Sequence, residues 1–377
     1  MLSTSARWVV GATLTMAAAL GVGRFAYTPL LPEMTLAFGW SYGQAGDLAS
    51  ANFLGYLAGA LMAPKLAVSP QVRAWVALSL MGTVLTTFLG SEADLYWQWV
   101  VLRFLGGVAS AICLVGVTAH LIQVLARQGT EHLGNIHFAG VGLGILLCMA
   151  GVFLGGGVAE QWSRQGLIAA VCVALAWVLL REGPWLAAPT VQGADSDADE
   201  AGLWPVIVGY GLFGFGYVVS ATFVVAMGEN LAAQGIDPRA SWVAVGAGTL
   251  PSVYLWQWFA QRRGLALSLR VAYAVLAVGT LLAGWVQSVW ALLFAAVLLG
   301  GTFAGITALG LSAGRQLAPQ RVAAVVSIMT VAFSIGQLLG PAVAGRMADV
   351  LGGFFWPSVL ATSLVLVALL LVPKQLR

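Results

Sequence analysis

Apolar runs of about 20 residues recur along the whole chain, separated by short segments rich in Pro, Gly and charged residues. A helix of this length, rising 1.5 Å per residue, crosses a hydrocarbon layer ~30 Å thick. Because that layer contains no water, each run must satisfy its own backbone hydrogen bonds, which favours helix. The every-second-residue alternation of a membrane β-barrel does not occur. The pattern therefore predicts an all-α integral membrane protein.

The breaks divide the chain into twelve predicted transmembrane helices. Their expected limits are residues 8–30, 41–63, 73–90, 95–122, 133–156, 163–180, 204–227, 240–260, 265–286, 289–312, 321–344 and 355–373. The longest polar stretch is acidic and lies between the sixth and seventh helices, which is typical of a solvated linker. We therefore expect a six-helix bundle at residues 1–186, a cytoplasmic linker at 187–203 and a second six-helix bundle at 204–377.

The basic residues predict the orientation of the chain. If the N-terminus is cytoplasmic, twelve of the 17 Lys and Arg residues lie on the inner side and three on the outer side. The other two, Arg24 and Arg103, fall inside predicted helices. An inner excess of this size is the rule for membrane proteins. It predicts a multi-pass protein of the bacterial inner membrane with both termini in the cytoplasm.

Composition excludes several classes of protein. Only 8% of the residues are charged and 60% are hydrophobic, whereas a soluble domain has about a quarter charged residues. A net charge of +3 without a basic stripe does not indicate a nucleic-acid partner. The three cysteines lie within apolar runs, which argues against a disulfide framework or a zinc site. We expect no metal and no cofactor, and the chain lacks the phosphate-binding loop of ATP-driven enzymes.

The two predicted bundles share short sequence motifs. Gly21-Val22-Gly23-Arg24 in the first helix is echoed by Gly214-Phe215-Gly216-Tyr217 in the seventh, 193 residues later. Phe104-Leu105-Gly106-Gly107 in the fourth is echoed by Leu298-Leu299-Gly300-Gly301 in the tenth, 194 residues later. The agreement of the two offsets, at equivalent helix numbers, indicates a six-plus-six parallel repeat.

The chain resembles the major facilitator superfamily over essentially its full length. The segments Gly21–Pro32 and Tyr210–Tyr217 resemble the YbfB/YjiJ group of bacterial members, and Arg103, Gly107 and Ala111 fit the superfamily's fourth-helix motif. This resemblance implies a major facilitator fold of two pseudo-symmetric bundles. It also implies alternating access to a solute site between the bundles, near the middle of the membrane.

Other family motifs are incomplete. The loop after the second helix lacks the Asp of the family's gating motif, and Ala63 stands about where it would be. The fifth-helix antiporter motif has its glycines but no Pro, so the resemblance does not establish antiport. The glycines are Gly140, Gly142, Gly144 and Gly151.

Three ionisable residues lie inside predicted helices at similar depth: Arg24, Asp47 and Arg103. Each costs ~2.5–3.5 kcal/mol to insert, so each is a functional candidate. Two cations and one anion leave one positive charge, which we expect at Arg24, binding an anionic group such as a carboxylate. Asp47 could carry the coupling proton, and the resemblance implies a role in proton coupling for Arg103. The alternative is structural: Asp47 pairs with an arginine, and the other arginine binds carbonyl groups.

Four uncharged polar residues are further candidates for solute contact: Tyr27, Asn52, Tyr217 and Gln337. Tyr27 follows Arg24 by three residues, and Tyr217 occupies the position equivalent to Arg24 in the repeat. Hydrogen bonding between helices is the alternative role for each of them.

The sequence therefore predicts a secondary active transporter that moves a small solute by alternating access, driven by protons and acting as a monomer in the lipid bilayer. An organic anion or an amino-acid-like metabolite is the expected solute. Two alternatives are an efflux transporter for hydrophobic solutes and a transporter-like solute sensor. An enzyme is not expected, because no nucleophile, base or metal cluster is apparent.

Overall fold

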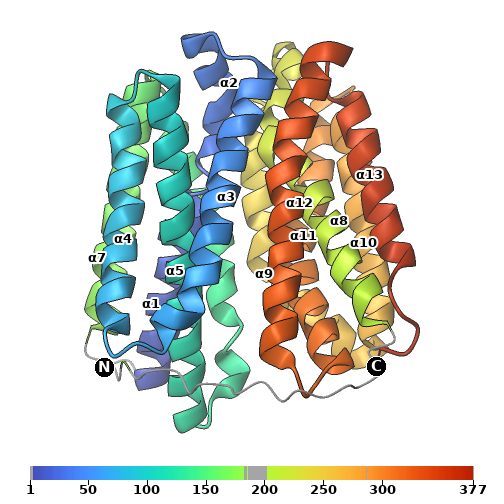
Figure 1. The fold of residues 1–377 in the computed structure, drawn as a ribbon. Helices are drawn as coiled ribbons and strands as arrows, with labels where there is room; N and C mark the ends of the chain where they lie inside the picture. Colours follow the sequence, from blue (N-terminus) through green and yellow to red (C-terminus); the bar gives the residue numbers. More distant parts are fainter. Residues whose placement is uncertain (1–2, 182–184, 186–201, 286, 377) are drawn as a thin grey trace. The chain divides into compact units, whose positions relative to one another are not determined.

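The computed structural model describes residues 3–181, 185, 202–285 and 287–376. Within these residues every regular element is a helix, so the predicted all-α fold is confirmed (Figure 1). The predicted linker, residues 187–203, lies outside the described residues except for its last two positions. The α-helices are α1 (Thr4–Met16), α2 (Tyr27–Phe38), α3 (Tyr42–Ala67), α4 (Val72–Phe88), α5 (Tyr96–Arg127), α6 (Ala139–Val152), α7 (Val158–Leu180), α8 (Leu203–Met227), α9 (Ala240–Arg263), α10 (Leu265–Gly284), α11 (Val289–Leu317), α12 (Val322–Leu351) and α13 (Phe355–Leu370).

These helices correspond to the twelve predicted spans, because α1 and α2 are two parts of one span, Thr4–Phe38. Nine of the spans in the described chain are long and apolar enough to cross a membrane by length and hydropathy. The other three are α3, α9 and α13. α13 has only 16 residues, and α3 and α9 contain polar side chains such as Asp47 and Gln257.

The first span is longer than predicted and is interrupted. α1 is followed by a π-helix, η1 (Ala17–Val22), and a turn at residues 23–26 precedes α2. The prediction ended this span at residue 30, because breaks were placed at Pro, Gly and charge clusters. Pro29 instead lies in the first turn of α2, where a missing backbone N–H costs nothing, and Pro32 lies inside the same helix.

The described chain forms two compact units, which we call the first unit (Met1–Phe38 and Ala51–Thr190) and the second unit (Gly39–Ser50 and Val191–Arg377). α3 therefore begins in the second unit and continues in the first. The predicted bundles placed residues 39–50 with the N-terminal half of the chain.

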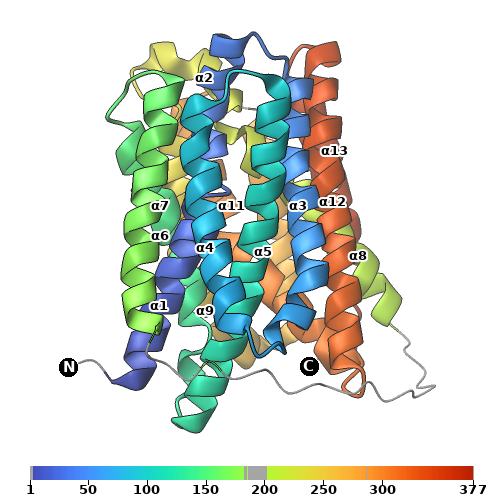
Figure 2. The same ribbon diagram turned by 60° about the vertical axis from the view of Figure 1, so that its left-hand side comes forward.

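In the first unit, α4 packs against α5 and α7, and α1 packs against α7, as the two views of the ribbon show (Figures 1 and 2). α7 exposes apolar side chains along one helical face: Leu167, Val171, Leu175 and Val178. A contiguous exposed apolar face of this kind suits a lipid environment better than water.

Glycine sets the distance between helices around the interrupted span. η1 packs on α6 so closely that a Cβ atom on Gly21 would lie 2.5 Å from the Cα of Gly144. α3 and α5 are equally close, since a Cβ on Gly55 would lie 1.9 Å from the backbone oxygen of Phe104. Only glycine permits such backbone contact, which is common between membrane helices. These contacts hold η1 against α6 and α3 against α5.

In the second unit, α8 packs against α12, α9 against α11 and α10 against α13. α8 is an uninterrupted helix of 25 residues, unlike the first span. Its glycines again contact a neighbouring backbone: a Cβ on Gly336 of α12 would lie 2.1 Å from the oxygen of Gly211.

Candidate functional site

Arg24 lies in the turn between η1 and α2 and is only 6% exposed. Its guanidinium carbon lies 4.4 Å from the ring centre of Phe53 and 4.4 Å from that of Tyr56, both on α3. The Arg24 guanidinium also donates a hydrogen bond to the Tyr56 hydroxyl. Aromatic faces stabilise a cation through their quadrupole without cancelling its charge. We call Arg24, Phe53 and Tyr56 the arginine cage.

Arg103, on α5, is 5% exposed and points at the interruption in the first span. Its Nη2 donates to the carbonyl oxygen of Arg24 at 3.1 Å, and its Nη1 donates to that of Gly23 at 3.4 Å. The ring of Tyr27 covers the same guanidinium, 4.7 Å from its carbon atom. The predicted site residue Tyr27 therefore packs on Arg103.

Asn52 connects α3 to α5 next to these groups. Its Nδ2 donates to the carbonyl oxygen of Arg103 at 2.8 Å, and the side chain is 1% exposed. Within the described part of the chain, its Oδ1 has no hydrogen-bond partner. The structure thus brings four predicted site residues together in the first unit: Arg24, Tyr27, Asn52 and Arg103.

Asp47 lies in the portion of α3 that belongs to the second unit. Its two carboxylate oxygens accept hydrogen bonds from Nη1 and Nη2 of Arg346 at 2.7 and 2.8 Å. The sequence suggested an arginine partner for Asp47; the partner is Arg346, on α12, which is one of the three basic residues expected on the outer side. Both side chains are substantially exposed, at 38% and 59%.

A second carboxylate, this one on α12, binds the first turn of α3. Asp349 accepts hydrogen bonds from the backbone N–H groups of Tyr42 and Gly43 at 2.9 and 2.8 Å. The hydroxyl of Tyr42 donates to Glu229 at 2.9 Å. A carboxylate on the free N–H groups of a helix N-terminus satisfies them and complements the helix dipole. Sequence reasoning missed this contact, since the partners are more than 300 residues apart.

The remaining predicted residues, Tyr217 and Gln337, meet in the second unit. Nε2 of Gln337 donates to the Tyr217 hydroxyl, and both side chains are buried. The Tyr217 ring stacks on the rings of Phe303 and Phe333. Its centre lies 5.5 Å from that of Phe303 and 5.7 Å from that of Phe333, and the angle between the ring planes is 3° in each pair. We call Tyr217, Phe303 and Phe333 the aromatic stack. The two phenylalanines were not predicted.

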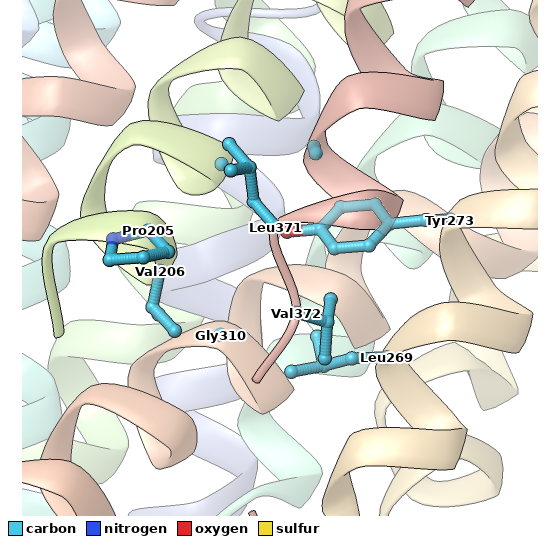
Figure 3. A pocket seen from close by; sticks show the side chains of 9 residues that line it. Pro205, Val206, Leu269, Tyr273, Gly310, Leu371 and Val372 are labelled. Carbon is cyan, nitrogen blue, oxygen red and sulfur yellow. The ribbon is translucent and has the colours of Figure 1, made fainter. Parts of the chain in front are cut away.

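A small pocket opens elsewhere in the second unit, among α8, α10, α11 and the end of α13 (Figure 3). Most of its lining side chains are apolar, such as those of Pro205, Val206, Leu269 and Leu371, and Tyr273 adds an aromatic ring with a hydroxyl. None of its lining residues is charged, so it offers no group to orient a polar solute. Among the described residues, no group of three or more His, Cys, Asp or Glu side chains could hold a metal ion.

Solved structures with the same fold are transporters. The nucleoside transporter NupG is 14% identical in sequence; the alignment covers 98% of this chain and 98% of NupG, with a TM-score of 0.70. A variant of NupG is 12% identical; that alignment covers 96% of this chain and 98% of the variant, with a TM-score of 0.71. A bacterial homologue of the human lysosomal transporter Spinster, in an inward-facing and unoccupied conformation, is 14% identical, with 99% and 96% covered and a TM-score of 0.68. At these identities the likeness is one of fold.

No match was found among curated protein sequences. Residues 16–373, however, match the family described as uncharacterised MFS-type transporter YbfB, which confirms the resemblance read from the sequence motifs. The chain belongs to this family of the major facilitator superfamily and is a multi-pass membrane transporter, not an enzyme.

Proposed function

We propose that the protein is a secondary active transporter that moves a small solute bearing an anionic group across the bacterial inner membrane by alternating access. The observation that carries this proposal is the arginine cage: Arg24 is only 6% exposed, and its guanidinium packs on the rings of Phe53 and Tyr56. A charge inside a membrane protein is costly to insert and is therefore a functional candidate.

A carboxylate is the group that suits this cage best. A guanidinium presents parallel N–H donors that match the two oxygens of a carboxylate, and the contact is stronger in a medium of low dielectric constant. Asn52, on α3 beside Phe53 of the cage, contributes a buried amide that could hydrogen-bond to a polar group of the solute. An organic anion or an amino-acid-like metabolite is thus the proposed solute class.

We also propose that protons drive the transport and that Asp47 carries the coupling proton. Protonation would remove the carboxylate charge that holds both Nη atoms of Arg346. The contact between α3 and α12 would then weaken, so that proton binding and helix movement are linked. The excess of Lys and Arg on one side supports cytoplasmic termini for the working protein.

Uptake into proteoliposomes with an imposed pH step tests the proposal. The assay would offer radiolabelled monocarboxylates, dicarboxylates and amino acids, each with and without the pH step. Arg24→Ala should lower transport of the accepted anion at least ~100-fold, because charged hydrogen bonds to the solute are lost. Arg127→Ala, which removes an exposed arginine at the end of α5, serves as the matched control. Wild-type kinetics in Arg24→Ala would refute the anion site.

The aromatic stack favours a second candidate function, efflux of hydrophobic solutes. Three parallel rings offer an apolar surface with specific geometry. In that case a hydrophobic dye would be transported equally well by wild type and Arg24→Ala. A third reading, a sensor that binds its solute without moving it, predicts saturable binding but no counterflow in the same proteoliposomes.

A further inference from the structure

The interruption of the first span leaves backbone groups that a regular helix would pair. The amide of Phe25 bonds to the oxygen of Leu20, in the five-residue pattern of a π-helix, and the amide of Thr28 bonds to the oxygen of Phe25 rather than that of Arg24. Broken helices are tolerated within membranes only where neighbouring groups satisfy the freed backbone. At this interruption the carbonyl groups of Gly23 and Arg24 accept hydrogen bonds from Arg103.

Arg103 is itself held in place from both ends. Asn52 of α3 binds its backbone oxygen at 2.8 Å, and Tyr27 covers its guanidinium. Its Nη2 donates to the backbone carbonyl of Arg24, the residue whose side chain forms the arginine cage with Phe53 and Tyr56. Three segments thus form a closed cycle: α3 holds α5 through Asn52, α5 holds the turn through Arg103, and the turn returns to α3 through Arg24.

The second unit provides an internal comparison. Tyr217 stands 193 residues after Arg24, within the uninterrupted helix α8. Arg103 corresponds to Ala296 at the same offset of 193, or to Val297 at the offset of 194 of the fourth-helix motif. Neither an alanine nor a valine side chain can donate to carbonyl groups. The interruption and the arginine that binds it therefore occur together in the first unit, and the equivalent positions of the second unit have neither.

We propose that Arg103 is a positioning residue: it binds the carbonyls of Gly23 and Arg24 and thereby fixes the interrupted backbone so that Arg24 is aimed into its cage. This role differs from direct transfer of a proton by Arg103. The positioning role rests on the proposed function in one respect, namely that Arg24 contacts the solute. The effect of Arg103 on the backbone does not depend on the proposed function.

Hydrogen–deuterium exchange of the full-length protein in detergent tests the positioning role without any solute. In Arg103→Ala, exchange of the amides at residues 23–28 should quicken by about tenfold or more, because the charged hydrogen bonds to two carbonyls are lost. Labelling of Arg24 by phenylglyoxal, measured by mass spectrometry, should quicken as well. Arg103→Lys retains a cation that donates hydrogen bonds, so it should restore much of the protection and keeps the test valid if the alanine variant fails to fold.

Transport then separates positioning from proton coupling. For the anion accepted in the uptake assay, Arg103→Lys should raise KM and leave the pH profile of transport unchanged. The proposal would be overturned if Arg103→Ala left both the rates of amide exchange and the rate of phenylglyoxal labelling unchanged. It would also be overturned if Arg103→Lys preserved the exchange rates but shifted the pH profile of transport. If no anion is transported, the anion site fails, while the exchange result still decides the positioning role.

Discussion

The two units share a backbone plan and differ in the chemistry that it carries. A Cβ on Gly107 of α5 would lie 2.0 Å from the oxygen of Asn52 on α3, and a Cβ on Gly300 of α11 would lie 2.1 Å from the oxygen of Val245 on α9. Both residues of the second pair stand 193 positions after those of the first, so the contact matches Gly107 with Gly300 and not with Gly301, its partner in the motif. The repeat suggested by short motifs thus reappears as equivalent contacts between helices.

At the centre of this shared plan, the first unit has a caged cation and the second has the aromatic stack. The reason that both can be built on one plan is that the glycine contacts involve backbone atoms, which are insensitive to the side chains on other faces of the helices. Packing and chemistry are therefore separable in this protein, and each can be tested alone.

The largest expected effect comes from making the first unit resemble the second. Arg24→Tyr should lower transport of the accepted anion at least ~100-fold, because a tyrosine cannot supply the charged, two-pronged donor. Tyr217→Phe is the control in the other unit, since it removes one hydroxyl and preserves the ring. Uptake into proteoliposomes measures both. Comparable losses of anion transport in Arg24→Tyr and Tyr217→Phe would contradict the assignment of the anion site to the arginine cage of the first unit alone.

The shared glycine contacts should be next in size. Gly107→Ala and Gly300→Ala each force a Cβ onto a neighbouring carbonyl, and we expect each to lower the free energy of unfolding by about 1–3 kcal/mol. The adjacent glycines are matched controls: a Cβ on Gly301 meets nothing within 4 Å, and one on Gly106 meets the Thr86 side chain at 3.2 Å. Unfolding in mixed micelles measures all four. Equal stability within each adjacent pair would contradict the close backbone contacts.

A smaller effect is expected from the hydrogen bond of the second unit. Gln337→Leu removes the donor to the Tyr217 hydroxyl, and the expected cost is about 1–2 kcal/mol of unfolding free energy, as for a buried hydrogen bond. Combining it with Tyr217→Phe should cost less than the sum of the single changes, because the two groups interact. Strict additivity in the same unfolding assay would argue against a hydrogen bond between them.

The smallest effect on stability should come from the pair of Asp47 and Arg346. Exposed ion pairs contribute about 0.2–1 kcal/mol and are screened by salt. A double-mutant cycle with Asp47→Asn and Arg346→Gln, at low and high salt, measures this contribution. An interaction energy well above that range would mean that the pair is buried from solvent in the working protein.

The sequence alone predicted the membrane spans, the repeat and the charged residues inside the spans. The lengths of the apolar runs predict the spans, since crossing a bilayer is a requirement on each segment by itself. Short motifs repeated at one offset predict the two-fold plan, and the rarity of charge inside the spans singles out Arg24, Asp47 and Arg103. Their roles in solute binding and proton coupling remain predictions.

Only the tertiary structure decided which groups these residues contact. Arg103 binds carbonyls 79 and 80 positions away in the chain, and Asp47 binds an arginine 299 positions away. Such pairings depend on the rotation and register of whole helices against one another, which no local pattern encodes. The interruption beside Arg24 was not predicted from the sequence for the same reason: a helix breaks inside a membrane where neighbouring groups satisfy the freed backbone, and here Arg103 of α5 is such a group.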